Sequence, residues 1–392
     1  MKNLRFVILL IAIMSVFPVA IQATEDTDSL FSAADSTRRH RTIFDRLIDY
    51  LDDTNKEKPY KRVDFSFLGG PFYSNESKFG IGLVASGIYR PFMGDSVTPP
   101  SIASLYGQIT TTLCYSVGIN GTHIGRNDNF RFNYDFKFRS FPTAFWGIGF
   151  DLNKLNANKT KYKDFRFTMI ADATWRIGDG SLFVGPAMEF ACIQARDIKG
   201  SDLLWDGQHL RFTSLGLGVT ASLDTRDNLT APQSGWLLKV DQKFFPRFLH
   251  NSNRNFSMTE AGISRYNRAW QGAVIATRLH GRFTYGHTPW GLLSSLGGSY
   301  TMRGYWEDRY RDKCAMDLIV ELRQRVYRRS GIVVWGGVGA VFPDFGAIRF
   351  KRLLPNGGIG YRWEFKRNSN VRIDFGFGRG ETAFVFNINE AF

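Results

Sequence analysis

The stretch LGGSYTMRGYWEDRYRDK, Leu296 to Lys313, concentrates side chains that can form ion pairs and hydrogen bonds. It joins two runs in which apolar and polar residues alternate as they do in β-strands. A hairpin between two strands needs only a few residues, so this connection is longer than a turn requires. The chemistry it offers is electrostatic. Arg303, at its centre, carries a planar guanidinium, which at low dielectric requires a carboxylate partner. Glu321, on the polar face of the next strand, can supply one, so the segment is predicted to have a role beyond connecting strands.

No catalytic motif accompanies this segment. The six histidines are scattered, and there is no Gly-x-Ser-x-Gly elbow. The glycine-rich run from Gly376 to Gly380 mimics a nucleotide-binding loop, but it lies in a strand pattern and no helix follows it. Cys114, Cys192 and Cys314 show neither a metal spacing nor a disulfide framework, which is typical of small apolar strand residues. The sequence therefore predicts no enzymatic activity, no metal site and no cofactor.

The composition favours strands and an anionic partner. Among 392 residues there are 39 glycines and 35 phenylalanines, and aromatic residues reach 15%. These residue types favour strands and turns over helices. The formal charge is +14, and it falls to +12 if Lys2 and Arg5 are removed. Such a charge suits the acidic sugars and phosphates of an outer leaflet, or nucleic acid, but a secreted chain without a nucleic-acid motif argues against the latter.

The N-terminal part predicts export. Residues 1–23 have a positive start, an apolar run from Phe6 to Val16 and a small-residue exit, the pattern of a signal peptide. The apolar run is shorter than the roughly 20 residues of a spanning helix. Residues 24–61 form a polar periplasmic leader, in which apolar side chains recur at helical spacing from Ile43 to Leu51. We expect one short amphipathic helix there, which acts as a tether, lies on the membrane or plugs a barrel.

From residue 62 to residue 392, apolar side chains recur at every second position. In NVRIDFGFG, for example, Val371 and Phe375 alternate with Arg372 and Asp374. A soluble sandwich also alternates, but here the polar set is rich in glycine and charge while the other set is Phe, Leu, Ile and Val. Combined with a signal peptide and no spanning helix, this pattern predicts an all-β fold, a transmembrane antiparallel β-barrel of about 16 strands.

The number of strands predicts at which end of the barrel residues 296–313 lie. Both chain ends lie in the periplasm when the number of strands is even, so short links such as SFPTA, residues 140–144, are expected at the inner end. Long links are expected outside. Strand eleven is predicted at roughly 272–284 and strand twelve at roughly 313–327, which places 296–313 within the sixth outward loop.

Four stretches, in order along the chain, resemble the BamA/TamA superfamily, the bacterial surface antigen barrels. They are GPFYSNESKFGIGLVASGIY, DTRDNLTAPQSGWLLKV, LGGSYTMRGY with its following VELRQRV, and the final FVFNINEAF. The resemblance covers about 330 residues, the whole presumed barrel. That superfamily includes proteins of assembly, translocation and two-partner secretion. Because residues 24–61 are too few for a POTRA module, the chain is identified as a short member lacking POTRA domains.

The resemblance implies roles for particular residues. The sixth loop would fold back into the lumen, where its arginine is pinned to acidic residues of strands twelve and thirteen. The implied loop motif is Met302, Arg303, Gly304 and Tyr305. Its implied partner is Glu321. Strand thirteen has Gly337 where the family usually carries an aspartate, so the arginine is either held more weakly or uses Asp317 as a second partner. The closing-strand signal read by the assembly machinery corresponds to Phe384, Phe386, Ile388 and Phe392.

Three functions remain open at this point. The first is insertion or translocation of protein or lipid at the outer membrane of a Gram-negative-type bacterium, through the seam between the first and last strands. For this seam we expect a short first strand, 62–68, against a longer closing strand, 383–392. The second is a passive pore, and the third an enzyme on a barrel scaffold, which the missing motifs argue against. Expected partners are outer-membrane lipid, including anionic lipopolysaccharide, and an unidentified protein. Five basic residues are expected to face the lumen, where they form a basic wall and either have a functional role or only form salt bridges within a solvated interior: Arg278, His280, Arg282, Arg323 and Arg325.

Overall fold

The computed structural model describes residues 63–74, 78–92, 98–200, 205, 207–249, 254–366 and 369–392. The predicted signal peptide, residues 1–23, and the predicted leader with its helix, residues 24–61, lie outside the described residues. No helix in the described part of the chain is long and apolar enough to cross a bilayer.

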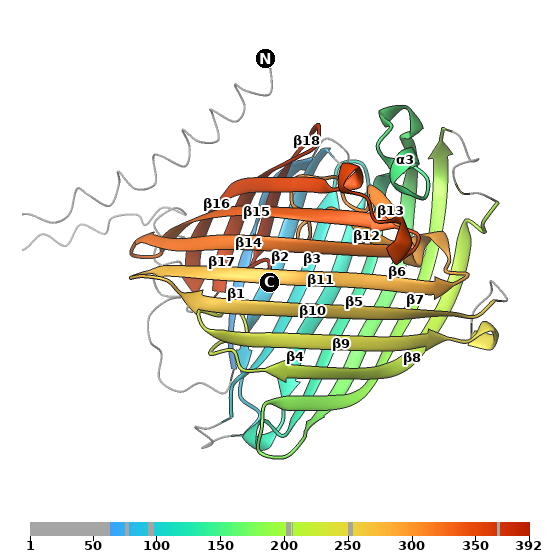
Figure 1. Ribbon diagram of the computed structural model, residues 1–392. Coiled ribbons are helices and arrows are strands. Elements are labelled where there is room, and N and C mark those ends of the chain that lie inside the picture. Colours follow the sequence, from blue (N-terminus) through green and yellow to red (C-terminus); the bar gives the residue numbers. More distant parts are fainter. Residues whose placement is uncertain are drawn as a thin grey trace, which may run out of the picture. The chain divides into compact units, whose positions relative to one another are not determined.

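Sixteen strands of the described chain form one antiparallel sheet that curls into a barrel (Figure 1), and each strand pairs with the next in chain order. The predicted all-β barrel of about 16 strands is confirmed. The strands are β1 (Val63–Ser74), β2 (Lys78–Tyr89), β3 (Ser101–Thr110), β4 (Tyr115–Ile124), β5 (Phe130–Phe145), β6 (Thr160–Arg176), β7 (Leu182–Lys199), β8 (Arg211–Asp224), β9 (Gly235–Phe245), β10 (Phe256–Arg268), β11 (Ala273–Gly286), β14 (Cys314–Tyr327), β15 (Ser330–Phe342), β16 (Leu354–Lys366), β17 (Ser369–Gly378) and β18 (Glu381–Ile388).

Smaller elements lie in the connections. A short hairpin, β12 (Ser294–Leu296) with β13 (Tyr310–Asp312), lies between β11 and β14. One helical turn, α3 (Phe150–Asn153), follows β5. Single 3-10 turns span Arg126–Asp128, Asn156–Asn158, Arg247–Leu249, Trp290–Leu292, Phe345–Ala347 and Phe350–Arg352.

Each strand presents its alternating sequence to two different environments, because successive side chains of a strand point to opposite faces of the sheet. On β14, Leu318 and Val320 are exposed on the outside, whereas Asp317 and Glu321 are buried inside the barrel. The same division holds on β17, where Asp374 is buried and the neighbouring phenylalanines are exposed. The alternation of apolar and polar residues in the sequence therefore corresponds to a lipid-facing outer surface and a polar lumen.

The long connections gather at the end of the barrel where α3, β12 and β13 lie (Figure 1). From β5 onward, five connections of at least ten residues lie at this end: 146–159, 200–210, 246–255, 287–313 and 343–353. One of similar length, 225–234, lies at the opposite end. The end with the five long connections is the outer end, since outer-membrane barrels have their long loops outside and their short turns in the periplasm. The predicted link SFPTA is wrong, because these residues lie within β5, where Pro142 opposes Lys163 of β6. Proline removes only one donor from a ladder, and the pairing continues on both sides of it.

The two strands expected to form the seam also differ from prediction. β1 has 12 residues and pairs with β2 through Gly69, Gly70 and Pro71, so it is not short. β18 has eight residues and ends at Ile388, not at residue 392. Asn389 has a φ of +65°, and this left-handed backbone turns Glu390 to Phe392 away from the sheet. Among the described residues no ladder joins β18 to β1.

Inside the barrel, the outer half of the lumen is filled by apolar side chains. Aromatic rings from β5, β6, β8, β9 and β10 surround Trp205 and Trp290, which come from two outer connections. Trp205 and Trp290 meet edge to face at 5.8 Å between ring centres. A second apolar cluster contains Leu296, Met302 and Tyr305 of the connection between β11 and β14. Close packing of large rings excludes water from this part of the lumen.

Candidate functional site

The connection between β11 and β14, residues 287–313, folds back into the lumen; it is called loop six below. β12 and β13 form its stem, and its tip returns at Gly304, whose φ is +148°. An added Cβ at Gly304 would lie 2.7 Å from the backbone of Phe377, so only glycine allows the tip to approach β17 so closely. Met302 is completely buried beside Gly339 of β15. The tip is thus packed against the inner wall of β15–β17.

Arg303 is completely buried at the tip and contacts two carboxylates. Its Nη1 donates to Oδ2 of Asp374 on β17 at 2.6 Å, and its Nη2 donates to Oε2 of Glu321 on β14. The guanidinium also lies 3.9 Å from the ring centre of Trp335 on β15. A planar cation with both ends on carboxylates and one face on an aromatic ring has little freedom to move.

Glycines on β17 provide the space for this tip. A Cβ added at Gly376 would lie 1.8 Å from the carbonyl oxygen of Arg303, and one added at Gly378 would lie 2.6 Å from the Tyr305 ring. The same carbonyl accepts a hydrogen bond from the Asn356 side chain at 2.8 Å. The glycine run that mimics a nucleotide-binding loop in the sequence is therefore a seat for loop six.

Tyr305 joins loop six to β16 and to the turn between β17 and β18. Its hydroxyl donates to the carbonyl oxygen of Pro355 at 2.6 Å and accepts from the backbone N–H of Arg379 at 2.8 Å. Burial raises the pKa of Tyr305 to about 12, because the charged phenolate would lose its hydration. The hydroxyl therefore keeps the proton that it donates to Pro355.

The charged residues after the tip extend loop six across the lumen. Glu381 of β18 accepts from the backbone N–H of Trp306 at 2.9 Å and pairs with Arg309 at 2.7 Å. On the opposite wall, Arg139 of β5 pairs with Glu307 at 2.7 Å. The Arg139 guanidinium lowers the pKa of Glu307 because it stabilises the charged carboxylate. Loop six thus bridges β18 and β5 and closes the outer part of the lumen.

A cluster of charges surrounds the two carboxylates that hold Arg303. Arg323 binds Glu321 at 2.7 Å, and Arg362 binds Asp374 at 2.6 Å. The whole charge cluster comprises the cations Arg303, Arg323, Arg362 and Arg372 and the anions Glu321, Asp374 and Glu390. With four cations and three anions, each carboxylate is shared by more than one guanidinium. Removal of one guanidinium therefore leaves no carboxylate of the cluster alone.

The structure brings together only some of the residues singled out from the sequence. Arg303 and Glu321 are in contact, but Asp317 is not a partner of Arg303, and that expectation is wrong. Asp317 instead pairs with Arg278 at 2.9 Å and with His280 at 3.2 Å. Gly337 faces the lumen beside Ile319 and offers no side chain. The second carboxylate comes from Asp374, two strands beyond strand thirteen.

The inward cations of the predicted basic wall are largely paired. Arg282 contacts Glu189 at 3.4 Å, His280 contacts Glu260 at 3.0 Å, and Arg323 contacts Glu321. At the inner rim, Arg325 contacts Glu364 at 3.4 Å. The wall is therefore a salt-bridged interior within the described part of the barrel.

The closing-strand residues divide into two groups. Phe384 and Phe386 are exposed on the outer face of β18, while the Ile388 side chain lies outside the described residues. Phe392 is not on the strand. Its ring lies inside the barrel near Arg278 and Arg323, with 4.9 and 5.4 Å between the guanidinium carbons and the ring centre. The backbone turn at Asn389 causes this difference.

Sequence reasoning missed several residues that contact the tip: Asp374, Trp335, Asn356, Gly376, Gly378 and Glu381. A signal was available for β17, because the alternation in NVRIDFGFG places Asp374, Gly376 and Gly378 on the inward face. No local pattern indicates that β17 faces loop six, because that contact depends on how the barrel curves.

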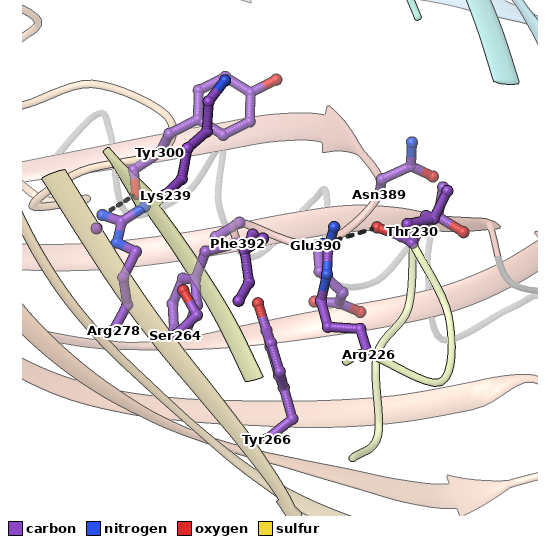
Figure 2. A pocket seen from close by; sticks show the side chains of 14 residues that line it. Arg226, Thr230, Lys239, Ser264, Tyr266, Arg278, Tyr300, Asn389, Glu390 and Phe392 are labelled. Carbon is purple, nitrogen blue, oxygen red and sulfur yellow. Dashed lines mark hydrogen bonds between the residues drawn. The ribbon is translucent and has the colours of Figure 1, made fainter. Parts of the chain in front are cut away.

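A cavity of about 470 Å³ lies on the inner side of loop six (Figure 2). Tyr300 of loop six and the final residues Asn389 to Phe392 line it, together with side chains of β9–β11 and of the link after β8. Arg226, Lys239 and Arg278 contribute cations to its wall, and Glu390 contributes a carboxylate. The lumen is therefore hollow beneath a filled outer half. The described residues contain no group of three or more His, Cys, Asp or Glu suited to a metal ion.

Replacing Arg303 by alanine is expected to loosen loop six without unfolding the barrel. The change removes two charge-assisted hydrogen bonds, each worth about 1.5–3 kcal/mol. Glu321 keeps Arg323 and Asp374 keeps Arg362, so neither carboxylate is left alone. Protease cleavage within residues 297–309 and conductance in planar bilayers should both rise. Arg247→Ala, on an exposed outer loop, serves as the control. Parental values of both measurements in Arg303→Ala would show that Arg303 does not hold the loop.

Comparison with known proteins identifies the family. A family model described as the Omp85 superfamily domain matches residues 108–347, more than half of the chain. No curated protein sequence matches. Among solved structures, BamA from Haemophilus ducreyi lacking POTRA domains 1-3 is 14% identical, with 84% of this chain and 70% of that chain covered and a TM-score of 0.51. CdiB from Escherichia coli is 11% identical, with 85% and 63% covered and a TM-score of 0.53.

At these identities the two structures show a common fold. The match to the family model extends from β3 into the outer connection after β15 and includes loop six. It confirms the resemblance to the BamA/TamA superfamily drawn from the four sequence stretches. The chain belongs to the Omp85 superfamily and is an outer-membrane β-barrel related to BamA and CdiB.

Proposed function

We propose that this barrel inserts or translocates polypeptide or lipid at the outer membrane through the seam between β1 and β18, while Arg303 keeps loop six in the lumen. The observation that carries the proposal is the sheet order. Strands pair consecutively from β1 to β18, and the described residues include no ladder that joins the last strand to the first. Membership of a superfamily that includes assembly, translocation and secretion proteins supports the same function.

The seam offers a physical route for a strand-like substrate. β1 pairs with β2 over all 12 of its residues, so one edge of β1 is fully occupied. Its other edge faces the seam, where β18 has only eight residues. An extended segment can add to such a sheet edge through main-chain hydrogen bonds. In a bilayer this pairing is favourable because backbone groups have no water to bind.

The filled lumen argues against a passive pore, the alternative function. Loop six bridges β5 and β18 through Glu307 and Glu381. The aromatic cluster around Trp205 and Trp290 fills the space beside it. Solute passage would require this apolar packing and the charge cluster to separate. A seam-based function leaves both in place.

A seam cross-link tests the proposal. The three native cysteines, which are unbonded, are first replaced. Cysteines are then placed at Phe67 on β1 and Phe386 on β18, both exposed on the outer face, and are joined with a bis-maleimide. The cross-linked barrel should fold, as judged by a heat-modifiable gel shift, and fail to complement a deletion strain. Locking the seam removes the only step that the proposed function needs.

The matched control joins two strands that already pair. Phe375 and Phe384 are direct partners on β17 and β18, so cysteines there are cross-linked without locking the seam. This variant should complement normally. If the seam-locked barrel complements as well as the control, the function does not require the seam. High conductance of the parent barrel in planar bilayers would then support the passive pore.

A further inference from the structure

The outer ends of β6 and β7 carry an unusual arrangement of charge on the lipid-facing side. The register places Lys161 opposite Lys199 and Lys163 opposite Arg196, with a register shift between the two pairs where Asp197 has a φ of +51°. These residues face outward, because the intervening Tyr162 is buried in the lumen. Like charges directly opposite each other destabilise a sheet. Two successive cross-strand pairs of cations therefore need an external anion for compensation. The four residues are called the basic ladder below.

Within the part of the chain that the structure describes, no acidic side chain neutralises the basic ladder. Among the described residues, no carboxylate pairs with Lys161, Lys163, Arg196 or Lys199. The Arg196 Nε donates to the Gln194 side chain at 2.8 Å, which is a neutral acceptor. Its guanidinium carbon lies 4.3 Å from the ring centre of Phe165. The ring supports one face of the guanidinium, and the other donors of Arg196 remain available to an anion.

The position of the basic ladder in the membrane follows from the aromatic side chains on β6. Phe165 and Trp175 lie on the same outward face, ten residues apart in the sequence, and each contacts a ring of β5. At about 3.3 Å per residue and a tilt of about 40°, ten residues span about 25 Å. That is the height of the apolar band between the aromatic girdles of outer-membrane barrels. Lys163 comes directly beyond the outer girdle, and Lys161 follows it.

We propose that the basic ladder binds the phosphates of an anionic glycolipid in the outer leaflet. Arg196 and Lys163 lie where lipid phosphates lie, just beyond the apolar band, and supply charge-assisted hydrogen bonds to them. Phe165, Phe167 and Phe190 continue the same outward face below the cations, where acyl chains pack. This inference concerns the outer wall of the barrel and does not depend on the seam.

Binding of lipid A tests this site. The full chain is held in zwitterionic detergent, and its affinity for bisphosphorylated lipid A is compared with its affinity for dephosphorylated lipid A. The parent should bind only the phosphorylated form, with affinity falling as salt rises. The double variant Lys163→Gln/Arg196→Gln should weaken binding about 25-fold, because each cation that is removed lowers the affinity about fivefold. Without lipid A, the variant should unfold at the parental temperature or above it, because the repulsion is relieved.

The control removes the same charge elsewhere at the outer end. Lys154→Gln/Arg247→Gln lies on exposed outer connections and should bind lipid A like the parent. Equal binding of phosphorylated and dephosphorylated lipid A by the parent would overturn the proposal. So would parental affinity in Lys163→Gln/Arg196→Gln, or an equal loss in the control.

Discussion

Glu321→Gln is expected to destabilise the folded barrel by about 3–5 kcal/mol, the cost of removing one partner from a buried ion pair. Glu321 is completely buried and contacts Arg303 and Arg323, with Arg362 at 3.9 Å. Glutamine keeps the shape of the side chain but removes its charge. Four cations would then face two anions in the charge cluster. The measurement is urea-induced unfolding in lipid vesicles, followed by the heat-modifiable gel shift.

A surface acid provides the comparison for this change. Asp151 contacts Lys154 at 2.8 Å and Arg352 at 2.7 Å, but all three side chains are well exposed. Asp151→Asn should cost less than about 1 kcal/mol, because solvent screens such pairs. Arg303→Ala should lie between Asp151→Asn and Glu321→Gln, since it removes two charge-assisted hydrogen bonds but leaves three cations and three anions. If Glu321→Gln is as stable as Asp151→Asn, the charge cluster does not stabilise the barrel.

Gly376→Val is expected to expel the tip of loop six from its seat. The first atom of the new side chain would lie 1.8 Å from the carbonyl oxygen of Arg303, and the obstructing atom belongs to the backbone. A backbone cannot give way as a flexible side chain can, so the tip must leave. Conductance in planar bilayers and cleavage by protease at residues 297–309 should exceed those of Arg303→Ala. The expelled tip loses the hydrogen bond from Asn356 to Arg303 and the one from Tyr305 to Pro355 as well as the ion pairs.

The control for Gly376→Val is a glycine of β15, two strands away in the sheet. A Cβ added at Gly336 of β15 meets nothing within 4 Å. Gly336→Val makes the same chemical change in a strand, where valine is favourable, and should leave conductance and protease cleavage at parental values. Loop six would not be seated on β17 if Gly376→Val behaved like Gly336→Val in both measurements.

The sequence alone determined the barrel and the face that each side chain occupies. Alternation with a period of two is a local property, since neighbouring side chains of any strand point to opposite faces. This alternation alone places Glu321 of β14 and Asp374 of β17 on the inward face. It also placed β11 and β14, and therefore loop six, close to their observed bounds.

Only the tertiary structure decided which inward residues meet. Asp317 and Glu321 share one face of β14, but four residues of a strand span about 13 Å, so one arginine cannot hold both. Asp374 is far away in the sequence, yet the curvature of the sheet brings β17 to the same arginine. The like-charged pairs of β6 and β7 depend on register in the same way, because a shift of one residue exchanges the faces. The turn after β18 depends on one backbone angle at Asn389, which strand periodicity does not encode. Periodicity is read along one strand, whereas register, curvature and loop return arise between strands, and these determined the partners of Arg303.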